Sequence, residues 1–543
     1  MSTSTVVSHS VALPAAVPSV VRIGSASGDA RLRMPWRNAI AVGRAYELLR
    51  ADVQAHVQFV QQNIGYGYCR FHGIFHDDMD VVRRLSDGSL AFQWRQVDQI
   101  LDMLLSAGLR PFVELHSMPS ALASGIQTMF HWACNVTPPR SLTEWSLLIR
   151  EFAIHTIGRY GVEEVRHWYF EVWNEPDLPA FWTGTQAEYF NLYDATARTL
   201  KEIDSRLRVG GPATSKAVWI KDFIQHCDCE SVPLDFVSTH SYPQDEYVIY
   251  PDRQGSPHQP GHYFADTVRS VQEQVRSSTM PDLEIHWTEW NAISAASTAQ
   301  VDWIGNPTVD SLYAASFIVH NALQLDDAAD TLCYWTVSDV FEEAGMPQAP
   351  FSSTYGLLTV HGIPKASFNA FWLLSRLRGR PLSIKVAGTP SGCGCYATQE
   401  YDEINVLLWN HADLTEPRRD AWSGVVQFPQ TKSDLVLTMA HLREGAGSPW
   451  QAWTAMGSPQ NLSCAEEAML RAHAQMAWTT CTLRDAEQRL DFILEPNEVL
   501  YVSARPAGQN ALRKGGNAPG VATWNAGMGQ RSRGRGRSEM EHP

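Results

Sequence analysis

From about residue 35 to residue 374, short apolar runs alternate with longer runs whose apolar residues recur at helical spacing. Trp145, Leu148 and Phe152 illustrate the second kind, because they recur every three or four residues. Eight strands are predicted, at residues 36–42, 66–73, 110–116, 168–176, 208–214, 235–242, 284–291 and 331–339. Helices are predicted between them, for example at 93–109, 144–160, 188–204 and 310–325. Eight such units favour a closed (β/α)8 TIM barrel over an open sheet.

After residue 379 the pattern changes to short strand-like runs separated by turn residues, at 384–386, 404–409, 435–441 and 499–502. This pattern of short strands and turns predicts a C-terminal all-β sandwich, in which residues 463–478 form one helix or a long connection. We therefore divide the chain into an N-terminal arm (1–34), a catalytic barrel (35–378), a β-sandwich domain (379–507) and a disordered basic tail (508–543). Residues 20–23 of the arm are expected to add a strand to the sandwich.

Composition and charge narrow the class of protein. No apolar run approaches the roughly 20 residues that a membrane span needs. No Lys or Arg precedes Arg22, so the basic start of a secretory signal is missing and a cytoplasmic location is expected, with a periplasmic or secreted one as the alternative. The net charge of −15 argues against a nucleic-acid-binding body. The tail is basic but rich in Gly and Asn, which favours a solvated extension over an RNA-binding arm.

Two glutamates stand where predicted strands end. Glu175 follows Asn174 at the end of the fourth strand, and Glu289 lies between two tryptophans at the end of the seventh. The C-terminal end of a barrel strand is where such folds place catalytic groups. Cleavage of a glycosidic bond requires two carboxyl groups: one protonates the leaving oxygen, and the other attacks or activates water. For Glu175 alone, a surface salt bridge is the alternative interpretation, but a second glutamate at a tryptophan-rich strand end favours a glycoside hydrolase.

Other side chains suited to sugars are predicted at the same end of the barrel. Asn174 has an amide for a sugar 2-hydroxyl. His72, His240 and Tyr242 are hydrogen-bonding groups with little charge, and Trp335 has a flat face that can stack on a sugar ring. Signatures of serine hydrolases, zinc peptidases and nucleotide-binding proteins are absent from the sequence. No cofactor and no metal is predicted.

The motifs together resemble those of glycoside hydrolase family 39, which contains β-xylosidases and α-L-iduronidases. The resemblance runs from about residue 36 to residue 374 and continues into the sandwich. The segments that carry it are residues 42–45, 70–74, 77–78, 111–114, 135–139, 173–176, 209–212, 235–240, 287–291, 338–343, 362–365 and 452–459.

This resemblance implies a role for each matching residue. Glu175 corresponds to the general acid/base and Glu289 to the nucleophile, and Tyr242 would hydrogen-bond the nucleophile. The positions implied to contact the sugar are Asn174, His72, His240, Tyr242, Trp335, Glu343 and Phe130. The chain departs from xylosidase-type members at Ser117 and at residues 352–356. Both departures fall in loops expected near the pocket, so they bear on the substrate and not on the reaction.

The predicted activity is that of a retaining, exo-acting β-xylosidase that removes xylose from the non-reducing end of xylo-oligosaccharides by double displacement. One alternative is another specificity of the same family: arabinopyranosidase, galactosidase, uronidase or endo-glycosidase. The other alternative is a sugar-binding protein that lacks catalysis. The expected partner is an oligosaccharide or glycoside, without nucleic acid or membrane for the main body, and a homo-oligomer is left open.

Overall fold

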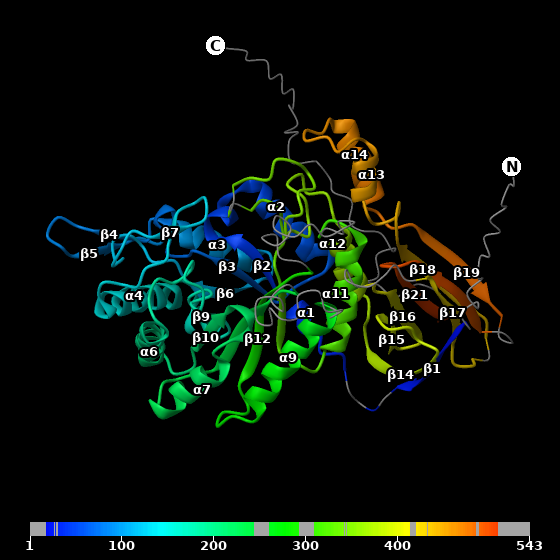
Figure 1. The fold of residues 1–543 in the computed structure, drawn as a ribbon, viewed down its shortest axis with the longest axis horizontal. Helices are drawn as coiled ribbons and strands as arrows, with labels where there is room; N and C mark the ends of the chain where they lie inside the picture. The colour runs from blue at the N-terminus through cyan, green and yellow to red at the C-terminus, as the bar shows by residue number, and fades with distance from the viewer. Residues whose placement is uncertain are drawn as a thin grey trace, which may run out of the picture.

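The computed structural model describes residues 18–26, 28, 31–243, 260–292, 309–341, 343, 345–412, 420–431, 433–484 and 488–508. These residues form a closed barrel of eight strands and a separate sheet of nine strands (Figure 1). The predicted basic tail falls outside the described residues from residue 509 onward. Among the helices that the structure describes, none has the length and hydropathy needed to cross a membrane.

The barrel confirms the predicted fold class. Its strands are β2 (Ala39–Arg44), β3 (Tyr68–His72), β6 (Arg110–Leu115), β9 (Tyr169–Val172), β10 (Arg208–Thr214), β11 (Phe236–Ser241), β12 (Glu284–Trp290) and β13 (Thr331–Tyr334). Each overlaps one predicted strand, and neighbouring strands pair in parallel until β13 meets β2 and closes the ring. Glu175 therefore follows the fourth barrel strand, and Glu289 lies on the seventh.

Seven of the eight predicted strands are longer than the observed ones, and the first, fourth and eighth differ by whole segments. The first predicted strand begins with a helical turn, α1 (Pro35–Asn38), because proline suits the first position of a helix. The fourth strand ends at Val172, and Trp173 and Glu175 then take left-handed backbone angles, with φ of 71° and 46°. The eighth strand ends at Tyr334. These early ends leave Asn174, Glu175 and the side chain of Trp335 in the loops at the C-terminal end of the barrel.

Helices connect successive strands and cover the outside of the barrel. The longer ones are α2 (Ala51–Asn63), α3 (Arg95–Ser106), α4 (Leu142–Tyr160), α6 (Gln186–Ile203), α7 (Ile220–Cys229), α9 (Pro260–Arg276), α11 (Leu312–Gln324) and α12 (Ala366–Leu374). Shorter elements are η1 (Ala45–Leu49), η2 (Asp77–Met79), β4 (Val82–Arg84), β5 (Leu90–Phe92), β7 (Thr128–Met129), β8 (Cys134–Asn135), α5 (Val162–Val165) and η3 (Ser215–Ala217). The start of α6 is set by a capping box between Thr185 and Glu188.

The second domain is built around the nine-stranded sheet. Its strands are β1 (Ser19–Ala26), β14 (Arg380–Ala387), β15 (Cys393–Glu400), β16 (Glu403–Asn410), β17 (Trp422–Gln427), β18 (Leu435–Leu442), β19 (Trp478–Leu483), β20 (Arg489–Leu494) and β21 (Val499–Pro506). β1 pairs with β14 and β17 although more than 350 residues separate them in sequence. Figure 1 shows this dark blue strand among the yellow and orange ones.

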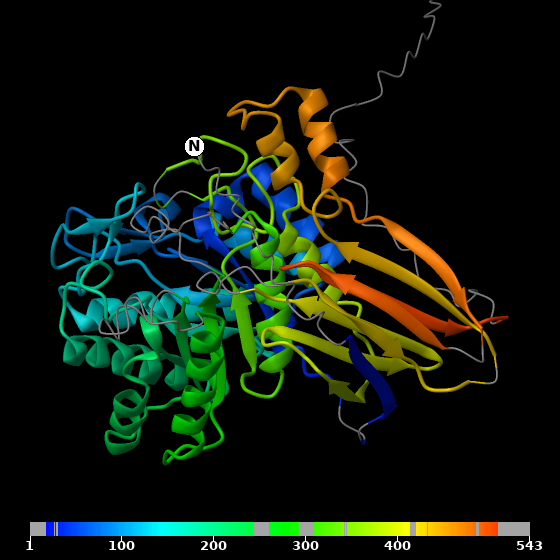
Figure 2. The same ribbon diagram turned by 45° about the vertical axis from the view of Figure 1, so that its right-hand side comes forward.

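The strands of the second domain enclose a core of their own. Side chains from both halves of the sheet meet there, such as Val426 and Phe492 on one side and Val406 and Leu437 on the other. Between β18 and β19 the chain forms α13 (Trp450–Ala455) and α14 (Cys464–His473), so the predicted helix at 463–478 is shorter than expected. Figure 2 shows these two helices, in orange, standing apart from the strands of their domain.

Candidate active site

The two predicted catalytic glutamates face each other at the C-terminal end of the barrel. Glu175 and Glu289 are 8% and 5% exposed. Between them lies His240, whose Nδ1 is 3.0 Å from Glu175 Oε1 and 3.7 Å from Glu289 Oε2. An oxygen of each glutamate and a ring nitrogen of His240 all lie within 4.8 Å of one another. The structure thus brings together two carboxyl groups that are 114 positions apart in the chain.

The surroundings of Glu175 favour a neutral carboxyl group. Burial raises the pKa of Glu175 to about 7, and the negative charge of Asp177 adds to this shift. The positive charges of Lys216, His72 and Arg70 oppose it without cancelling it. A carboxyl group with such a pKa holds a proton at neutral pH and can donate it.

The surroundings of Glu289 are those of a carboxylate held in one orientation. Arg70 Nη1 donates to Oε1 at 2.8 Å, and the Tyr242 hydroxyl donates to Oε2 at 2.8 Å. Burial, together with the negative charge of Glu289, raises the pKa of Tyr242 well above its ordinary value, so the phenol stays a donor. Two donors, one on each oxygen, match a group that can only accept hydrogen bonds.

Arg70 is the centre of a charged cluster inside the barrel. It is wholly buried on β3 and forms ion pairs with Glu114, Glu171 and Glu289 at 2.6 to 2.8 Å. Its Nη2 also donates to the side-chain oxygen of Asn174 at 3.0 Å, which orients the amide of that residue. Arg70 therefore contacts both Asn174, beside Glu175 in the loop after β9, and Glu289 on β12.

Sequence reasoning did not select Arg70, Glu114 or Glu171 as site residues. A signal was present, because Arg70 stands two positions before His72 on a strand otherwise made of apolar and aromatic residues. Residues two apart on a strand point to the same side, so these charges had to face the barrel interior with the histidine. Their mutual contacts, however, join strands that are distant in sequence.

His72 and Trp335 form one wall of the site. His72 Nδ1 is 2.7 Å from Glu114 Oε2, and its Nε2 is 3.6 Å from Glu289 Oε1. Burial alone would raise the pKa of Glu114, but the charges of His72 and Arg70 hold it below its usual range. The ring of Trp335 lies 4.5 Å from that of His72 and is 1% exposed.

Two loops carry the remaining predicted contact residues. Glu343 is in the loop after β13, where burial raises its pKa well above the ordinary value and the negative charges of Glu289 and Glu175 add to the shift. Phe130 is in the turn between β7 and β8, against Trp132. The His131 backbone N–H donates to the Glu343 carbonyl at 2.7 Å, so the two loops are joined.

The two departures from the xylosidase-type pattern also lie at this end of the barrel. Ser117 is wholly buried just after β6. The ring of Tyr355, in the loop 352–356, is 6.2 Å from that of Tyr242. The loop departure therefore adjoins the residue that donates to Glu289.

Two groups among the described residues have donor atoms close enough for a metal ion: His72 with Glu114 and His116, and Glu175 with His240 and Glu289. Arg70 contacts Glu114 in the first group and Glu289 in the second. A fixed guanidinium competes with any cation for these oxygens, so the donor set suits acid–base and nucleophilic chemistry better than metal binding.

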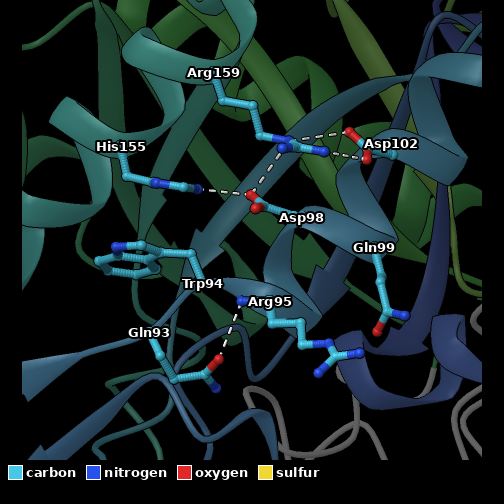
Figure 3. Close-up of a pocket in the computed structure, with 8 residues that line it drawn as sticks. All are labelled: Gln93, Trp94, Arg95, Asp98, Gln99, Asp102, His155 and Arg159. Atoms are coloured by element: carbon cyan, nitrogen blue, oxygen red, sulfur yellow. Dashed lines mark hydrogen bonds and ion pairs between the residues drawn. The ribbon is translucent and has the colours of Figure 1, made fainter.

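A hollow of about 490 Å³ lies elsewhere, on the outside of the barrel (Figure 3). Its residues come from the region of α3 and α4 and include Trp94, Asp98, His155 and Arg159. Four of its charged side chains, Asp98, Asp102, His155 and Arg159, are paired with one another, as in the 2.7 Å contact between His155 and Asp98. None of the predicted site residues lines this hollow, so it is not part of the candidate active site.

Comparison with known proteins places this geometry in a family. The model of glycosyl hydrolases family 39 matches residues 19–482. A β-xylosidase of Caldicellulosiruptor saccharolyticus is 35% identical, over 87% of this chain and 95% of its own. A β-xylosidase of Geobacillus stearothermophilus is 34% identical, over 89% and 95%.

Solved structures of family 39 enzymes are also similar to this chain. The chain covers 100% of a family 39 β-xylosidase from Caulobacter crescentus, with 90% of this chain aligned, a TM-score of 0.76 and 32% identity. It covers 99% of a family 39 enzyme from Xanthomonas axonopodis pv. citri, with 92% of this chain aligned, a TM-score of 0.79 and 29% identity. The chain therefore belongs to glycosyl hydrolase family 39 and is a glycoside hydrolase.

Proposed function

We propose that this protein is a retaining, exo-acting β-xylosidase that releases xylose from the non-reducing end of xylo-oligosaccharides. The observation that carries the proposal is the pair of facing carboxyl groups, with oxygens of Glu175 and Glu289 within 4.8 Å. Retaining glycosidases hold their two carboxyl groups about 5–5.5 Å apart, whereas inverting ones leave about 6.5–9.5 Å for a water molecule. The short separation favours direct attack by one carboxylate.

The different surroundings of the two groups assign their roles. In the first step, a Glu289 oxygen attacks the anomeric carbon while Glu175 gives its proton to the leaving oxygen, and a glycosyl ester forms on Glu289. The ester removes the negative charge of Glu289, which favours ionisation of Glu175. In the second step, Glu175 takes a proton from water, the water oxygen attacks the anomeric carbon, and Glu289 leaves as a carboxylate.

Two further observations support the substrate and the mode of action. The two relatives that are 34–35% identical are β-xylosidases, whereas an α-L-iduronidase of mouse is 23% identical over 70% of this chain. The contact between His131 and Glu343 joins two loops, and the first of these lies against the ends of β2 and β3 through Trp132, near Arg44 and His76. These contacts close one side of the entrance to the site, and such an entrance suits an oligosaccharide that enters by its non-reducing end.

The substrate is tested with aryl glycosides and a labelled oligosaccharide. We expect the highest kcat/KM for the aryl β-D-xyloside among xyloside, α-L-arabinopyranoside, β-D-galactoside and α-L-iduronide. Xylohexaose labelled at its reducing end should first give the labelled pentaose and free xylose. Labelled products of intermediate length would contradict exo action, and a higher kcat/KM for another glycoside would contradict the xylose specificity. Activity that persists unchanged in Glu175→Gln would contradict the site.

A further inference from the structure

A line of buried hydrogen bonds runs from the barrel interior to the proposed acid/base. Its members are Glu171 on β9, Thr288 on β12, His240 on β11 and Glu175, and the first three are at most 1% exposed. The Thr288 hydroxyl is 2.8 Å from Glu171 Oε1, His240 Nε2 is 3.1 Å from Thr288 Oγ1, and His240 Nδ1 is 3.0 Å from Glu175 Oε1. Because each group in the line has a fixed number of protons and lone pairs, the direction of each hydrogen bond is determined by its neighbours.

The line begins at an acceptor. Glu171 Oε2 receives the Nε–H of Arg70 at 2.6 Å, so the carboxyl group is ion-paired and has no proton to give. Thr288 must therefore donate its hydroxyl proton to Glu171 Oε1. A hydroxyl has one proton, so Thr288 Oγ1 can only accept from its other partner, His240.

The tautomer of His240 follows. Nε2 must carry the proton that Thr288 accepts. Burial lowers the pKa of His240, so the ring is neutral and its other nitrogen, Nδ1, has a lone pair. Arg70 Nη2 approaches Nε2 at 3.4 Å, but its shorter contacts with Glu114 at 2.6 Å and Asn174 at 3.0 Å take its two N–H groups.

The lone pair of Nδ1 points at Glu175 Oε1. A protonated Glu175 can donate to it, whereas an ionised Glu175 would place two acceptors 3.0 Å apart. We propose that Glu171 and Thr288 are positioning residues for the reaction: they hold His240 in the Nε2-protonated tautomer, and this tautomer keeps the proton on Glu175. This inference rests on the proposed function, because it assigns Glu175 the role of acid/base.

Other charged and titratable groups also face Glu175, and the test must separate their effect from that of the line. They come from its own loop, from η3, β3 and β12, and from the segments after β11 and β13: Asp177, Lys216, His72, Arg70, Glu289, Tyr242 and Glu343. Thr288 contacts Glu171 and His240 and is uncharged. Changing Thr288 therefore alters the line without altering any charge around Glu175.

The test compares Thr288→Val with Thr288→Ser. Valine has the shape of threonine but cannot accept from Nε2, so the imidazole is free to carry its proton on Nδ1 and donate to ionised Glu175. We expect the alkaline limb of kcat/KM against pH to move down by about one unit. At a pH above the alkaline limbs of both proteins, kcat/KM of Thr288→Val should be about tenfold below that of the wild type. Near pH 5 the two values should differ little. The serine variant keeps the hydroxyl and should keep the wild-type profile.

Thr239→Val is the matched control, because Thr239 is also a buried barrel threonine but its hydroxyl donates to the Thr214 carbonyl at 2.8 Å. A limb that stays in place in Thr288→Val, or moves equally in Thr239→Val, overturns the inference.

Nitrogen-15 NMR of histidine-labelled protein gives an answer that needs no activity. The His240 signals are identified by their loss in His240→Gln, and we expect the Nε2-protonated pattern in the wild type. An Nδ1-protonated pattern overturns the inference even if the xylosidase activity is found. Because this measurement uses the wild-type protein, it decides the question even if Thr288→Val does not fold. Absence of activity on every glycoside, with the Nε2-protonated pattern present, contradicts the proposed function and leaves the tautomer assignment standing.

Discussion

The two ends of the barrel interior are built from the same strands but differ in chemistry. At the N-terminal end the inward side chains are mainly aromatic: Tyr68, Phe112, Tyr169, Phe236 and His286. Two positions further along, the same strands carry Arg70, Glu114, Glu171, Ser238 and Thr288, and then His72, His116 and His240. Layers of side chains from different strands fill a barrel of this kind.

The difference between the two ends indicates which part of the barrel stabilises the fold and which part performs the chemistry. The aromatic rings pack with centroids 4.6 to 5.7 Å apart and fill this end of the barrel. The Arg208 guanidinium lies 3.6 Å from the centre of the Tyr169 ring. The layer of Arg70, Glu114, Glu171, Ser238 and Thr288, called the charged layer below, contains one arginine and two carboxyl groups, and Arg70 also contacts Glu289. The desolvation of these charges must be offset by their mutual contacts. We therefore expect changes at the aromatic end to affect unfolding, and changes at the charged end to affect activity.

The largest effect is expected at the two glutamates, where azide can distinguish their roles. Glu289→Gly should lower kcat by more than about 10⁴-fold, because no glycosyl ester can form. Azide would enter the vacated space and give a glycosyl azide of inverted configuration. Glu175→Ala should lose roughly 10²–10⁴-fold, less for an aryl leaving group that departs without protonation, and azide should give a product of retained configuration.

Proton NMR of the anomeric centre in both azide products checks this prediction. Exchanged configurations would mean that the two roles are assigned in reverse. Wild-type rates in both variants would place the chemistry at another site.

The pH dependence should reflect the raised pKa of Glu175. Because the protonated form is needed for the first step, kcat/KM should fall as pH rises through about 7, the pKa of this buried carboxyl group. Two units above that pKa the loss is about 100-fold. Glu175→Gln should have little remaining activity and no alkaline limb near pH 7, and a limb that persists there would assign it to another group.

Within the charged layer, Glu114→Gln should lower kcat/KM by about tenfold or more. Glutamine has nearly the same shape, but it removes the negative charge that contacts Arg70 and His72 at 2.6 and 2.7 Å. His72 would lose its fixed orientation beside Glu289. Steady-state kinetics with the aryl xyloside measures the loss, and a wild-type kcat/KM in a folded variant would show that the charged layer is structural only.

The smallest effect on activity is expected at the aromatic end. Phe112→Leu leaves space between Tyr169 and Phe236 and should lower the free energy of unfolding by about 1–3 kcal/mol. Glu114, which contacts Arg70 and His72, lies two positions further along the same strand, so kcat/KM should stay within about twofold of the wild type. Denaturant unfolding and steady-state kinetics on one preparation measure the stability and the activity of this variant. A large loss of kcat/KM without a loss of stability would contradict the separation of stability and activity between the two ends of the barrel.

Much of the fold could be predicted because each β/α unit has its own local pattern. The strand at 208–214 was predicted with the bounds of β10, and the glutamates were expected at the ends of the fourth and seventh strands. The turn at Trp173 and the end of β13 at Tyr334 were not predicted, because the aromatic run continues past the place where the backbone changes direction. The roles of Glu175 and Glu289 stay predictions until the variants are measured.

The sequence by itself determined the order of strands and helices, because apolar periodicity records which face of each element is buried. It also determined which acidic residues stand at strand ends. Only the tertiary structure decided the partners inside the barrel: Arg70 meets Glu289 across 219 positions, and His240 meets Glu175 across 65. Periodicity contains no information on which strand lies opposite another. The raised pKa of Glu175 and the direction of each hydrogen bond arise from those distant contacts, so they exist only in the closed barrel.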